Sequence, residues 1–411
     1  MTGGERSPLA ILGGEPRFAS PLHVGCPNLG DQAAFLQRIE EVWSSQRLTN
    51  DGPLVREFER RVAEIAGVPH AVAVCNATAG LEVAMRGLEL TGEVIVPAFT
   101  FVATVHAVSW MGLTPVFCDV DPETHNLDPA AVRRAITPRT SAILAVNLWG
   151  NGAAPLELER IAAEHRLRLL FDSAHAFGCS HDHQPIGSFG DLEVFSFHAT
   201  KFVHSGEGGA IVTRDDELAR RLRLLRNFGF ATYDSVTAAG VNAKLSELHA
   251  AMGLTSLDSM PRFVEANRRN YAAYDAAFSH LPGIRLHPRP SSEVHNHQYV
   301  VLEVAPDETP LTRDELHRTL QAEGVLARRY FYPGCHRIPA TLAAAADVPP
   351  LPVTDRLCET VLQLPTGINV SIADIRSVGE LVVQAFSKAK EIREALRALE
   401  AGGGDGAAAR S

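Results

Sequence analysis

The sequence lacks closely spaced cysteine pairs. Its six cysteines include no CxxC pair, and none stands near a histidine at the spacing of a zinc site. We therefore expect no metal site. Scattered thiols fit a protein of the reducing cytosol, so a cytoplasmic location is predicted. The six are Cys26, Cys75, Cys118, Cys179, Cys335 and Cys358.

Long apolar runs and a surplus of positive charge are missing too. No run of about 18 apolar residues is present, and the stretch MTGGERSPLAILGGEPRF has no charged segment followed by an apolar one. A secreted or membrane-spanning protein is therefore not expected. With 38 basic and 48 acidic residues, the formal net charge is −10, which disfavours binding to nucleic acid or to an anionic membrane. An anionic ligand would need local donors.

The chain does contain enough apolar residues for a large core, because 45% of its 411 residues are hydrophobic and 21% are charged. From about residue 70, apolar runs alternate with amphipathic stretches, which predicts an α/β fold with a mostly parallel sheet covered by helices. Only about a dozen residues separate the last two runs, which is short for a helical crossover, so the seventh strand is a candidate for antiparallel pairing. The seven runs are residues 71–75, 93–97, 115–120, 141–147, 168–171, 193–197 and 209–213.

Four segments are predicted along the chain. Residues 51–265 would form a large domain, and residues 266–392, where strands and helices mix, a smaller C-terminal α/β domain. Residues 1–50 would pack near the small domain. Residues 393–411 would be a disordered tail, because the chain ends in the small, flexible residues AGGGDGAAARS.

The sequence around Lys201 favours a catalytic or cofactor-binding role for this lysine over that of a solvated surface residue. In FSFHATKFVHSGEGGAIVT, Lys201 follows Ser196, which closes a predicted strand, and Asp172 ends the run RLLFD. Ligands collect at the carboxyl ends of the strands of an open α/β sheet, so one crevice can hold all three side chains. A carboxylate directly after LLF is not the position of an ordinary surface charge.

A candidate phosphate site lies at the end of the first predicted strand. In CNATAGLEVAM, Thr78, Ala79 and Gly80 open a helix whose backbone N–H groups are left accessible by small residues. A plain threonine cap is the alternative. Together, a phosphate-binding helix start, a buried carboxylate, a hydroxyl and a lysine are the parts that pyridoxal phosphate requires. The lysine bonds to the cofactor aldehyde, and the carboxylate keeps the pyridine nitrogen protonated.

These motifs resemble those of the DegT/DnrJ/EryC1/StrS family of sugar aminotransferases, which are pyridoxal-phosphate enzymes of fold type I, related to aspartate aminotransferase. The likeness runs from LTNDGPLVREFE to VLQLPTG, most of the chain. It implies that the large domain binds the cofactor. The motifs in family order are GPLVREFE, NATAGL, VPAFTFVAT, PVFCDVDPETHNLDP, FDSAHAFG, SFHATK, EGGAIVT and NFGF.

The resemblance also implies roles for individual residues. Lys201 would be the Schiff-base lysine, Asp172 the partner of the pyridinium nitrogen and His175 the contact to the ring hydroxyl. Phe101 would stack on the ring face, and a core aromatic after a strand is the alternative. The cofactor phosphate would be held by Ser196, Thr78 and the amide of Ala79.

Two positions depart from the family pattern. Many members carry glutamine where this chain has His175, and glycine where it has Ala77. Either side chain at position 175 can bond to the ring oxygen, but a histidine would make the local charge depend on pH. Alanine at position 77 would tighten the phosphate turn.

The segment AGVNAKLSELHAAMG resembles one that in this family reaches into the active site of the neighbouring subunit. Asn242 would then contact the cofactor phosphate of the partner chain, and a homodimer with shared sites is expected. A polar flank of an ordinary helix is the alternative reading of this segment.

Further residues are candidate contacts to the substrate. Asn50 lies in LTNDGPLVREFE, where the likeness begins, and His198 precedes the lysine by three residues. The stretch RRYFYPGCH, with Tyr330 and Tyr332, mixes cations and aromatics in a way that suits a nucleotide sugar, although an exposed loop anchored by these tyrosines explains it nearly as well. Four more histidines are either substrate contacts or satisfied polar groups on loops: His204, His295, His297 and His336.

The expected reaction moves an amino group from glutamate to C-4 of dTDP-4-keto-6-deoxy-D-glucose, giving dTDP-4-amino-4,6-dideoxy-D-glucose. DSAHAFG, FSFHATK and EGGAIVT resemble the 4-aminotransferases of actinomycete deoxysugar pathways, which serve antibiotic biosynthesis, whereas 3-aminotransferases more often show DAAQAHG and FYPTKNLG. Amination of a 3-keto sugar is the main alternative. A related sugar dehydratase is disfavoured because such enzymes carry histidine in place of Lys201. A non-catalytic regulator is disfavoured because no DNA-binding module is visible.

Overall fold

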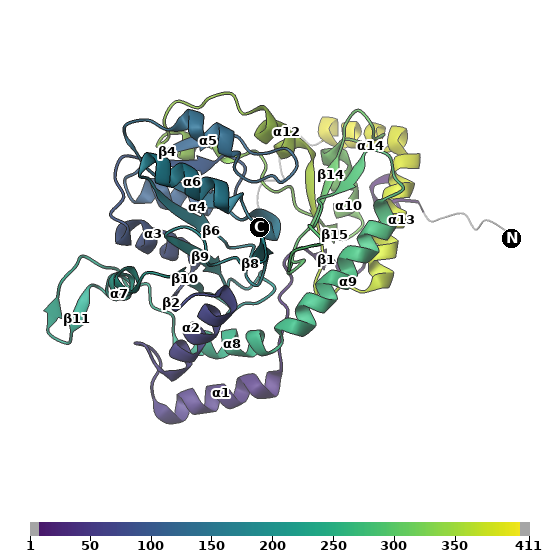
Figure 1. Cartoon of the computed structure of the whole chain (residues 1–411). Helices are drawn as coiled ribbons and strands as arrows, with labels where there is room; N and C mark the ends of the chain where they lie inside the picture. Colours follow the sequence, from purple (N-terminus) through teal and green to yellow (C-terminus); the bar gives the residue numbers. More distant parts are fainter. Residues whose placement is uncertain (1–7, 403–411) are drawn as a thin grey trace.

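The computed structural model describes residues 8–402, which form a large and a small lobe (Figure 1). The centre of the large lobe is a seven-stranded sheet in the order β2-β10-β9-β6-β5-β3-β4. β10 runs antiparallel to both of its neighbours, and the other strand pairs are parallel, which confirms the predicted mostly parallel sheet and the exceptional seventh strand. The strands are β2 (His70–Val74), β3 (Glu93–Pro97), β4 (Thr114–Cys118), β5 (Thr140–Val146), β6 (Arg168–Asp172), β9 (Leu192–Ser196) and β10 (Gly209–Thr213).

Helices cover both faces of this sheet because its strands are apolar on both sides. In β2, Ala71 and Ala73 face one core, whereas Val72 and Val74 face the other. The first core is covered by α2 (Pro53–Ala66), α5 (Pro129–Ala135), α6 (Pro155–His165) and α8 (Glu247–Asp258). The second is covered by α3 (Ala77–Gly87), α4 (Val102–Trp110) and α7 (Asp216–Leu225).

The long helix α9 (Met260–Phe278) joins the two lobes. Phe263, near its start, is buried in the core of the large lobe, whereas Tyr274 and Phe278 are buried in the core of the small lobe. The small lobe holds an antiparallel sheet of β13 (Ile284–Leu286), β14 (Val300–Val304) and β16 (Val361–Leu364). Its helices are α10 (Arg313–Ala322), α12 (Pro352–Thr360), α13 (Ile372–Ser387) and α14 (Ala389–Gly402), whereas the short α11 (Pro339–Leu342) packs against α4 of the large lobe.

The N-terminal segment contacts both lobes. Its short strand β1 (Leu22–His23) pairs in parallel with β15 (Val325–Leu326) of the small lobe. The helix α1 (Gln32–Ser45) instead packs against α8, under the large lobe. The segment therefore spans the two lobes, rather than lying only beside the small one.

The predicted tail from residue 393 is wrong for its first ten residues. Residues 393–402 continue helix α14, on which Ile392 and Leu396 are buried in the core of the small lobe. The apolar face of this helix packs on the core and holds the helix in place, although the chain ends in small residues that suggest disorder. Residues 403–411 of the predicted tail lie outside the described residues.

A hairpin of β11 (Phe230–Thr232) and β12 (Ser235–Val236) projects from the large lobe between α7 and α8 (Figure 1). Its side chains include the exposed Tyr233 and Val236. A second short hairpin is formed by β7 (Ser180–His181) and β8 (Gln184–Pro185). Within residues 8–402, no helix combines the length and apolar character needed to cross a membrane.

Candidate active site

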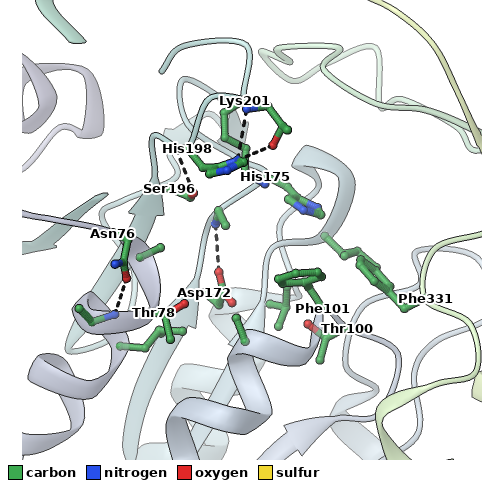
Figure 2. A pocket seen from close by; sticks show the side chains of 18 of the residues that line it. Asn76, Thr78, Thr100, Phe101, Asp172, His175, Ser196, His198, Lys201 and Phe331 are labelled. Carbon is green, nitrogen blue, oxygen red and sulfur yellow. Dashed lines mark hydrogen bonds between the residues drawn. The ribbon is translucent and has the colours of Figure 1, made fainter. Parts of the chain in front are cut away.

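The carboxyl ends of β6 and β9 bring three of the predicted residues to one cavity (Figure 2). Asp172 is the last residue of β6, Ser196 is the last residue of β9, and the two strands are paired. Lys201 follows β9 in a turn in which its amide donates to the carbonyl of His198 at 2.8 Å. The cavity has a volume of about 550 Å³.

The carboxylate of Asp172 is buried and held by two donors. Thr104 donates to Oδ2 at 2.7 Å, and the amide of Ala174 donates to Oδ1 at 3.2 Å. Burial raises the pKa of Asp172 above its usual value, although these donors and the charge of Lys201 oppose the shift. A cation placed against this carboxylate would relieve the cost of burying its charge.

The amine of Lys201 has a neutral partner, the hydroxyl of Tyr299, to which Nζ donates at 2.9 Å. Tyr299 lies just before β14 in the small lobe, and burial holds its pKa well above 10. Burial also lowers the pKa of Lys201 to about 8, and the nearby Asp172 limits the fall. An amine with this pKa is partly unprotonated near neutral pH, which a nucleophile or base needs.

His175 lies against the same cavity as a buried, neutral ring. Its Nδ1 accepts from the amide of Trp149 at 3.4 Å, and its ring stacks on the indole at 5.5 Å between centroids. Burial and the charge of Lys201 hold the pKa of His175 well below 6.5. The expectation that this histidine makes the local charge depend on pH is therefore wrong. Because Nδ1 accepts, Nε2 carries the proton and can donate.

The start of α3 forms the opposite wall of the cavity. The amide of Ala79, predicted to hold a phosphate, instead donates to the Oδ1 of Asn76, the N-cap residue, at 2.8 Å. The first amides of a helix have no acceptor within the helix, so those of Ala77 and Thr78 and the Thr78 hydroxyl are the donors left to an anion. Ser196 lines the same cavity (Figure 2).

This set of groups fits pyridoxal phosphate. The helix start and Ser196 offer donors to a phosphate, the buried carboxylate of Asp172 offers a partner to a ring nitrogen, and Lys201 offers an amine for the aldehyde. Burial in one cavity raises the pKa of Asp172 and lowers the pKa of Lys201, and shifted pKa values are common among the groups of an active site. No cluster of His, Cys, Asp or Glu side chains suited to a metal ion is found in residues 8–402.

Aromatic side chains form the outer walls. Phe101, the N-cap of α4, lines the cavity and is 53% exposed, which leaves its face open to a ring rather than placing it in the core. Tyr330 and Phe331 line the cavity from the small lobe. His198 also lines it and contacts Thr200 through Nδ1 at 2.8 Å.

Two predicted substrate contacts do not reach the cavity of their own chain. Asn50 lies in the exposed turn before α2, where its carbonyl accepts from Arg47 at 3.4 Å. Tyr332 points away from the cavity and packs under the guanidinium of Arg329, with 4.5 Å between that group and the ring centre. Of the four unassigned histidines, none lines the cavity; His204 and His336 bond to a backbone carbonyl and to Asp355.

Asn242 lies after the β11–β12 hairpin, outside this cavity. It forms an isolated bridge with Asn227, and Lys244 donates to its Oδ1 at 2.6 Å. Its predicted contact with a partner chain therefore stays a prediction.

The sequence reasoning missed Tyr299 and Thr104. Thr104 lies within the quoted motif VPAFTFVAT, and it bonds to Thr100, four residues earlier on the same side of the helix start, at 3.0 Å. That spacing was a usable signal. Tyr299 stands 98 residues from Lys201, so only the docking of the small lobe reveals the contact.

The model of the DegT/DnrJ/EryC1/StrS aminotransferase family matches residues 30–383. The chain belongs to this family. It is 34% identical over 352 residues to the Escherichia coli dTDP-4-amino-4,6-dideoxy-D-glucose transaminase, covering 84% of this chain and 94% of that one. It is 35% identical over 320 residues to the Streptomyces venezuelae dTDP-3-amino-3,4,6-trideoxy-alpha-D-glucose transaminase, covering 77% and 83%.

Solved structures agree with this membership. The structure of DesI in the presence of its TDP-sugar product is 51% identical in sequence, covers 95% of this chain and 99% of that one, and superposes with a TM-score of 0.91. The chain is thus a sugar-nucleotide aminotransferase of fold type I that uses pyridoxal phosphate. The fold class, the enzyme class and the cofactor predicted from the sequence are confirmed.

The bond between Lys201 and Tyr299 predicts a pH dependence. Because the pKa of Lys201 is about 8, steps that need its neutral amine should speed up as the pH rises through 8. Tyr299→Phe removes an acceptor that favours the ammonium form, so this rise should move to lower pH. The plateau rate should fall only a few-fold, because the amine is neutral there and the hydrogen bond that is lost joins two neutral groups, worth about 1 kcal/mol.

The measurement is a kcat profile from pH 6 to 10. Tyr271→Phe is the matched control, because its hydroxyl bonds to the backbone of His287 at 2.9 Å and has no contact with Lys201. An unshifted profile for Tyr299→Phe would show that the phenol does not tune the lysine.

Proposed function

We propose that this aminotransferase moves the amino group of glutamate to C-4 of dTDP-4-keto-6-deoxy-D-glucose. The products are 2-oxoglutarate and dTDP-4-amino-4,6-dideoxy-D-glucose. The observation that carries the 4-position is the strand-end motif set DSAHAFG, FSFHATK and EGGAIVT, which builds the walls around Asp172 and Lys201 and resembles that of 4-aminotransferases. Supporting it, the Escherichia coli relative and a Shigella dysenteriae relative, 37% identical over 313 residues, are both named for the 4-amino-4,6-dideoxy sugar.

In this proposal each side chain of the cavity has one task. Bound pyridoxal phosphate supplies an electron sink that stabilises negative charge on the carbon next to the transferred nitrogen. Lys201 holds the cofactor in its resting form and, once released, moves a proton between the cofactor and the substrate carbon. Tyr299 holds that amine while it is free, at the 2.9 Å contact seen in the structure.

The remaining groups position the cofactor. Asp172 keeps the ring nitrogen protonated, and Thr104 fixes the carboxylate in place at 2.7 Å. The Nε2–H of His175 donates to the ring hydroxyl, and Trp149 holds that imidazole in its orientation. Phe101 stacks on the open ring face, while Thr78 and Ser196 bind the phosphate.

Amination at C-3 is the second candidate, because the Streptomyces venezuelae relative at 35% identity is named for a 3-amino sugar. Regiochemistry depends on which sugar carbon is held against the reacting lysine, and a displacement of about 1 Å can change the rate about a hundredfold. The two candidates share every residue discussed above. Only the product separates them.

The test uses the purified holoenzyme, glutamate and a panel of 4-keto and 3-keto deoxysugar nucleotides, with products identified by mass and by NMR of the ring protons. We expect an amine at C-4 of the dTDP-linked 6-deoxy sugar. Turnover of a 3-keto-6-deoxy sugar nucleotide with none of the 4-keto isomer would overturn the 4-position. It would leave the aminotransferase assignment intact.

We also propose that two chains form a homodimer in which Asn242 contacts the partner's cofactor phosphate. Apolar side chains are exposed on the same side of the large lobe: Val241 is 49% exposed, and Trp110 is 81% exposed. Both line one surface pocket next to α3, whose start forms the phosphate end of the cavity. Exposed apolar groups that gather in this way are typical of an interface.

Mixing chains tests this sharing. A Lys201→Ala chain combined with an Asn242→Ala chain gives mixed dimers in which one of the two sites keeps both residues. We expect activity to recover to at least a measurable fraction of wild type, whereas each variant alone stays low. Mixed dimers purified on two different tags that show no recovery would mean that each site is built from one chain.

A further inference from the structure

Trp149, in the turn after β5, is fully buried although it does not line the cavity. Its backbone φ is 58°, in the left-handed region that a bulky residue rarely adopts. His125, in the loop after β4, is also fully buried and has a φ of 60°. Residues held in this region persist only where the surrounding structure fixes them, and they often occur at functional sites. The two side chains are hydrogen-bonded to each other, so the strain is concentrated at one contact.

A chain of hydrogen bonds joins Trp149 to the small lobe. The indole Nε1–H donates to Nδ1 of His125 at 3.2 Å. Because an indole N–H can only donate, Nδ1 is the acceptor and Nε2 of His125 carries the proton. That Nε2–H donates to Oε1 of Glu303, on β14, at 2.9 Å. The other oxygen of Glu303 pairs at 3.0 Å with Arg356 on α12, so the chain runs from a half-exposed ion pair of the small lobe to the buried indole.

The same indole contacts two residues of the active site. His175 stacks on it and accepts from the amide of Trp149, as described above. Tyr299 packs edge-on against it, with 5.5 Å between ring centroids and 64° between planes. The rings of His175 and Tyr299 also contact each other, at 4.2 Å between centroids. One side chain therefore supports both the histidine proposed to contact the cofactor and the phenol that accepts from Lys201.

Stacking and hydrogen bonding restrict the indole in different ways. Phe331 of the small lobe, which lines the cavity (Figure 2), stacks on the indole with 5.3 Å between ring centroids and 8° between planes. Such stacking fixes the plane of a ring but leaves the ring free to slide and turn within that plane. A hydrogen bond is directional, so the bond from Nε1 to His125 removes this remaining freedom. The indole needs both contacts to keep one orientation.

We propose that Trp149 is a positioning residue through which the small lobe sets the geometry of the cofactor site. Glu303 orients His125, which in turn orients the indole. The indole then holds His175 and Tyr299 in place. The inference rests on the roles proposed for those two residues, and it is independent of which sugar is aminated. Its consequence is that the cofactor contacts depend on the docking of the two lobes.

The test is a double-mutant cycle in the holoenzyme. Glu303→Leu removes the acceptor that holds His125, and Trp149→Phe removes the indole N–H but keeps an aromatic ring. We expect each variant to shift the visible absorption band of the bound cofactor and to lower kcat by roughly 10- to 100-fold, because small displacements near reacting atoms are costly. The KM for either substrate should stay within about threefold. The double variant should match Trp149→Phe alone, because the chain is already broken at the indole.

Two further variants separate positioning from stability. Arg356→Gln is the matched control, because it removes the outer partner of Glu303 and leaves the bond to His125. It should keep the wild-type absorption band and kcat. Glu303→Gln is the conservative variant: its amide oxygen can still accept from His125, so it should restore most of what Glu303→Leu loses. The melting temperature of each variant measures the loss of stability separately.

The orientation of the indole can also be measured without activity. The chain has three tryptophans, and Trp43 and Trp110 are each 81% exposed. Replacing both with phenylalanine leaves Trp149 as the single fluorescent indole. In that background Glu303→Leu should shift the emission of Trp149, whereas Arg356→Gln should not.

Several results would overturn the proposal. They are additive effects of Glu303→Leu and Trp149→Phe, an unchanged cofactor band in Glu303→Leu, and equal losses in Glu303→Leu and Arg356→Gln. An unshifted emission of Trp149 in Glu303→Leu would overturn it as well. The cofactor band and the emission are measured without any sugar. A failure of the proposed sugar substrate would therefore leave this test readable.

Discussion

Lys201→Ala should lower kcat by about 10⁴-fold or more while leaving the chain folded. One amine serves both to hold the cofactor and to carry the proton, and such groups each contribute large factors to the rate. The fold should survive because Lys201 lies in the loop after β9, outside the strands and helices of the core. The cofactor should still bind through Asp172 and the phosphate donors, but it should wash out on dialysis.

The measurement is single-turnover kinetics with glutamate, together with the visible spectrum before and after dialysis. Lys388→Ala is the control, because that amine pairs with Glu391 at 3.1 Å on a helix of the small lobe. Added methylamine should restore part of the lost rate of Lys201→Ala, as expected when the missing group is an amine. A variant that keeps more than a tenth of the wild-type rate would contradict the role of Lys201.

Asp172→Asn should lower kcat by about a thousandfold. This is the size of effect expected when a group that stabilises charge developing in the transition state loses its own charge. Asparagine fills the same volume and can still accept from Thr104 through its amide oxygen, so the fold should be kept. What is lost is the anion that holds a proton on the ring nitrogen, and with it the strength of the electron sink. Cofactor affinity should fall much less than turnover.

Thr104→Val is the companion variant, because it removes the 2.7 Å donor but leaves the carboxylate. We expect a fall of about tenfold, which corresponds to one hydrogen bond to a charged group. Rates are measured at saturating glutamate and sugar nucleotide, with the bound cofactor quantified by absorbance. Near-normal turnover in Asp172→Asn would show that the carboxylate has no part in the chemistry.

Much of the large lobe was predictable because its signals are local. A strand buried on both faces is a continuous apolar run, and the polar residue that ends it marks the edge where ligands collect. That is how Asp172 and Ser196, at the ends of β6 and β9, and the nearby Lys201 could be grouped before their distances were known. The antiparallel direction of β10 was predictable from a local signal too, because the connection before it is short for a helical crossover to a parallel strand.

The errors came from contacts that sequence spacing does not encode. Tyr299 reaches Lys201 only because the small lobe docks on the large one. Tyr332 stands two residues from Tyr330, yet the chain turns it onto Arg329 and away from the cavity. The Ala79 amide was expected to be free for a phosphate, but it donates a hydrogen bond to the side chain of Asn76. Asparagine is a strong N-cap residue, and that preference was a signal left unused.

The central claim, that one buried lysine carries the cofactor, is tested most directly by reducing the holoenzyme with borohydride and mapping the labelled peptide. The sequence has four lysines, Lys201, Lys244, Lys388 and Lys390, so the outcome has few alternatives. Lys201 is the lysine that lines the cavity and has a pKa lowered to about 8. The account predicts one cofactor per chain, fixed to the peptide that contains Lys201. Label on any of the other three lysines, or none on Lys201, would contradict it.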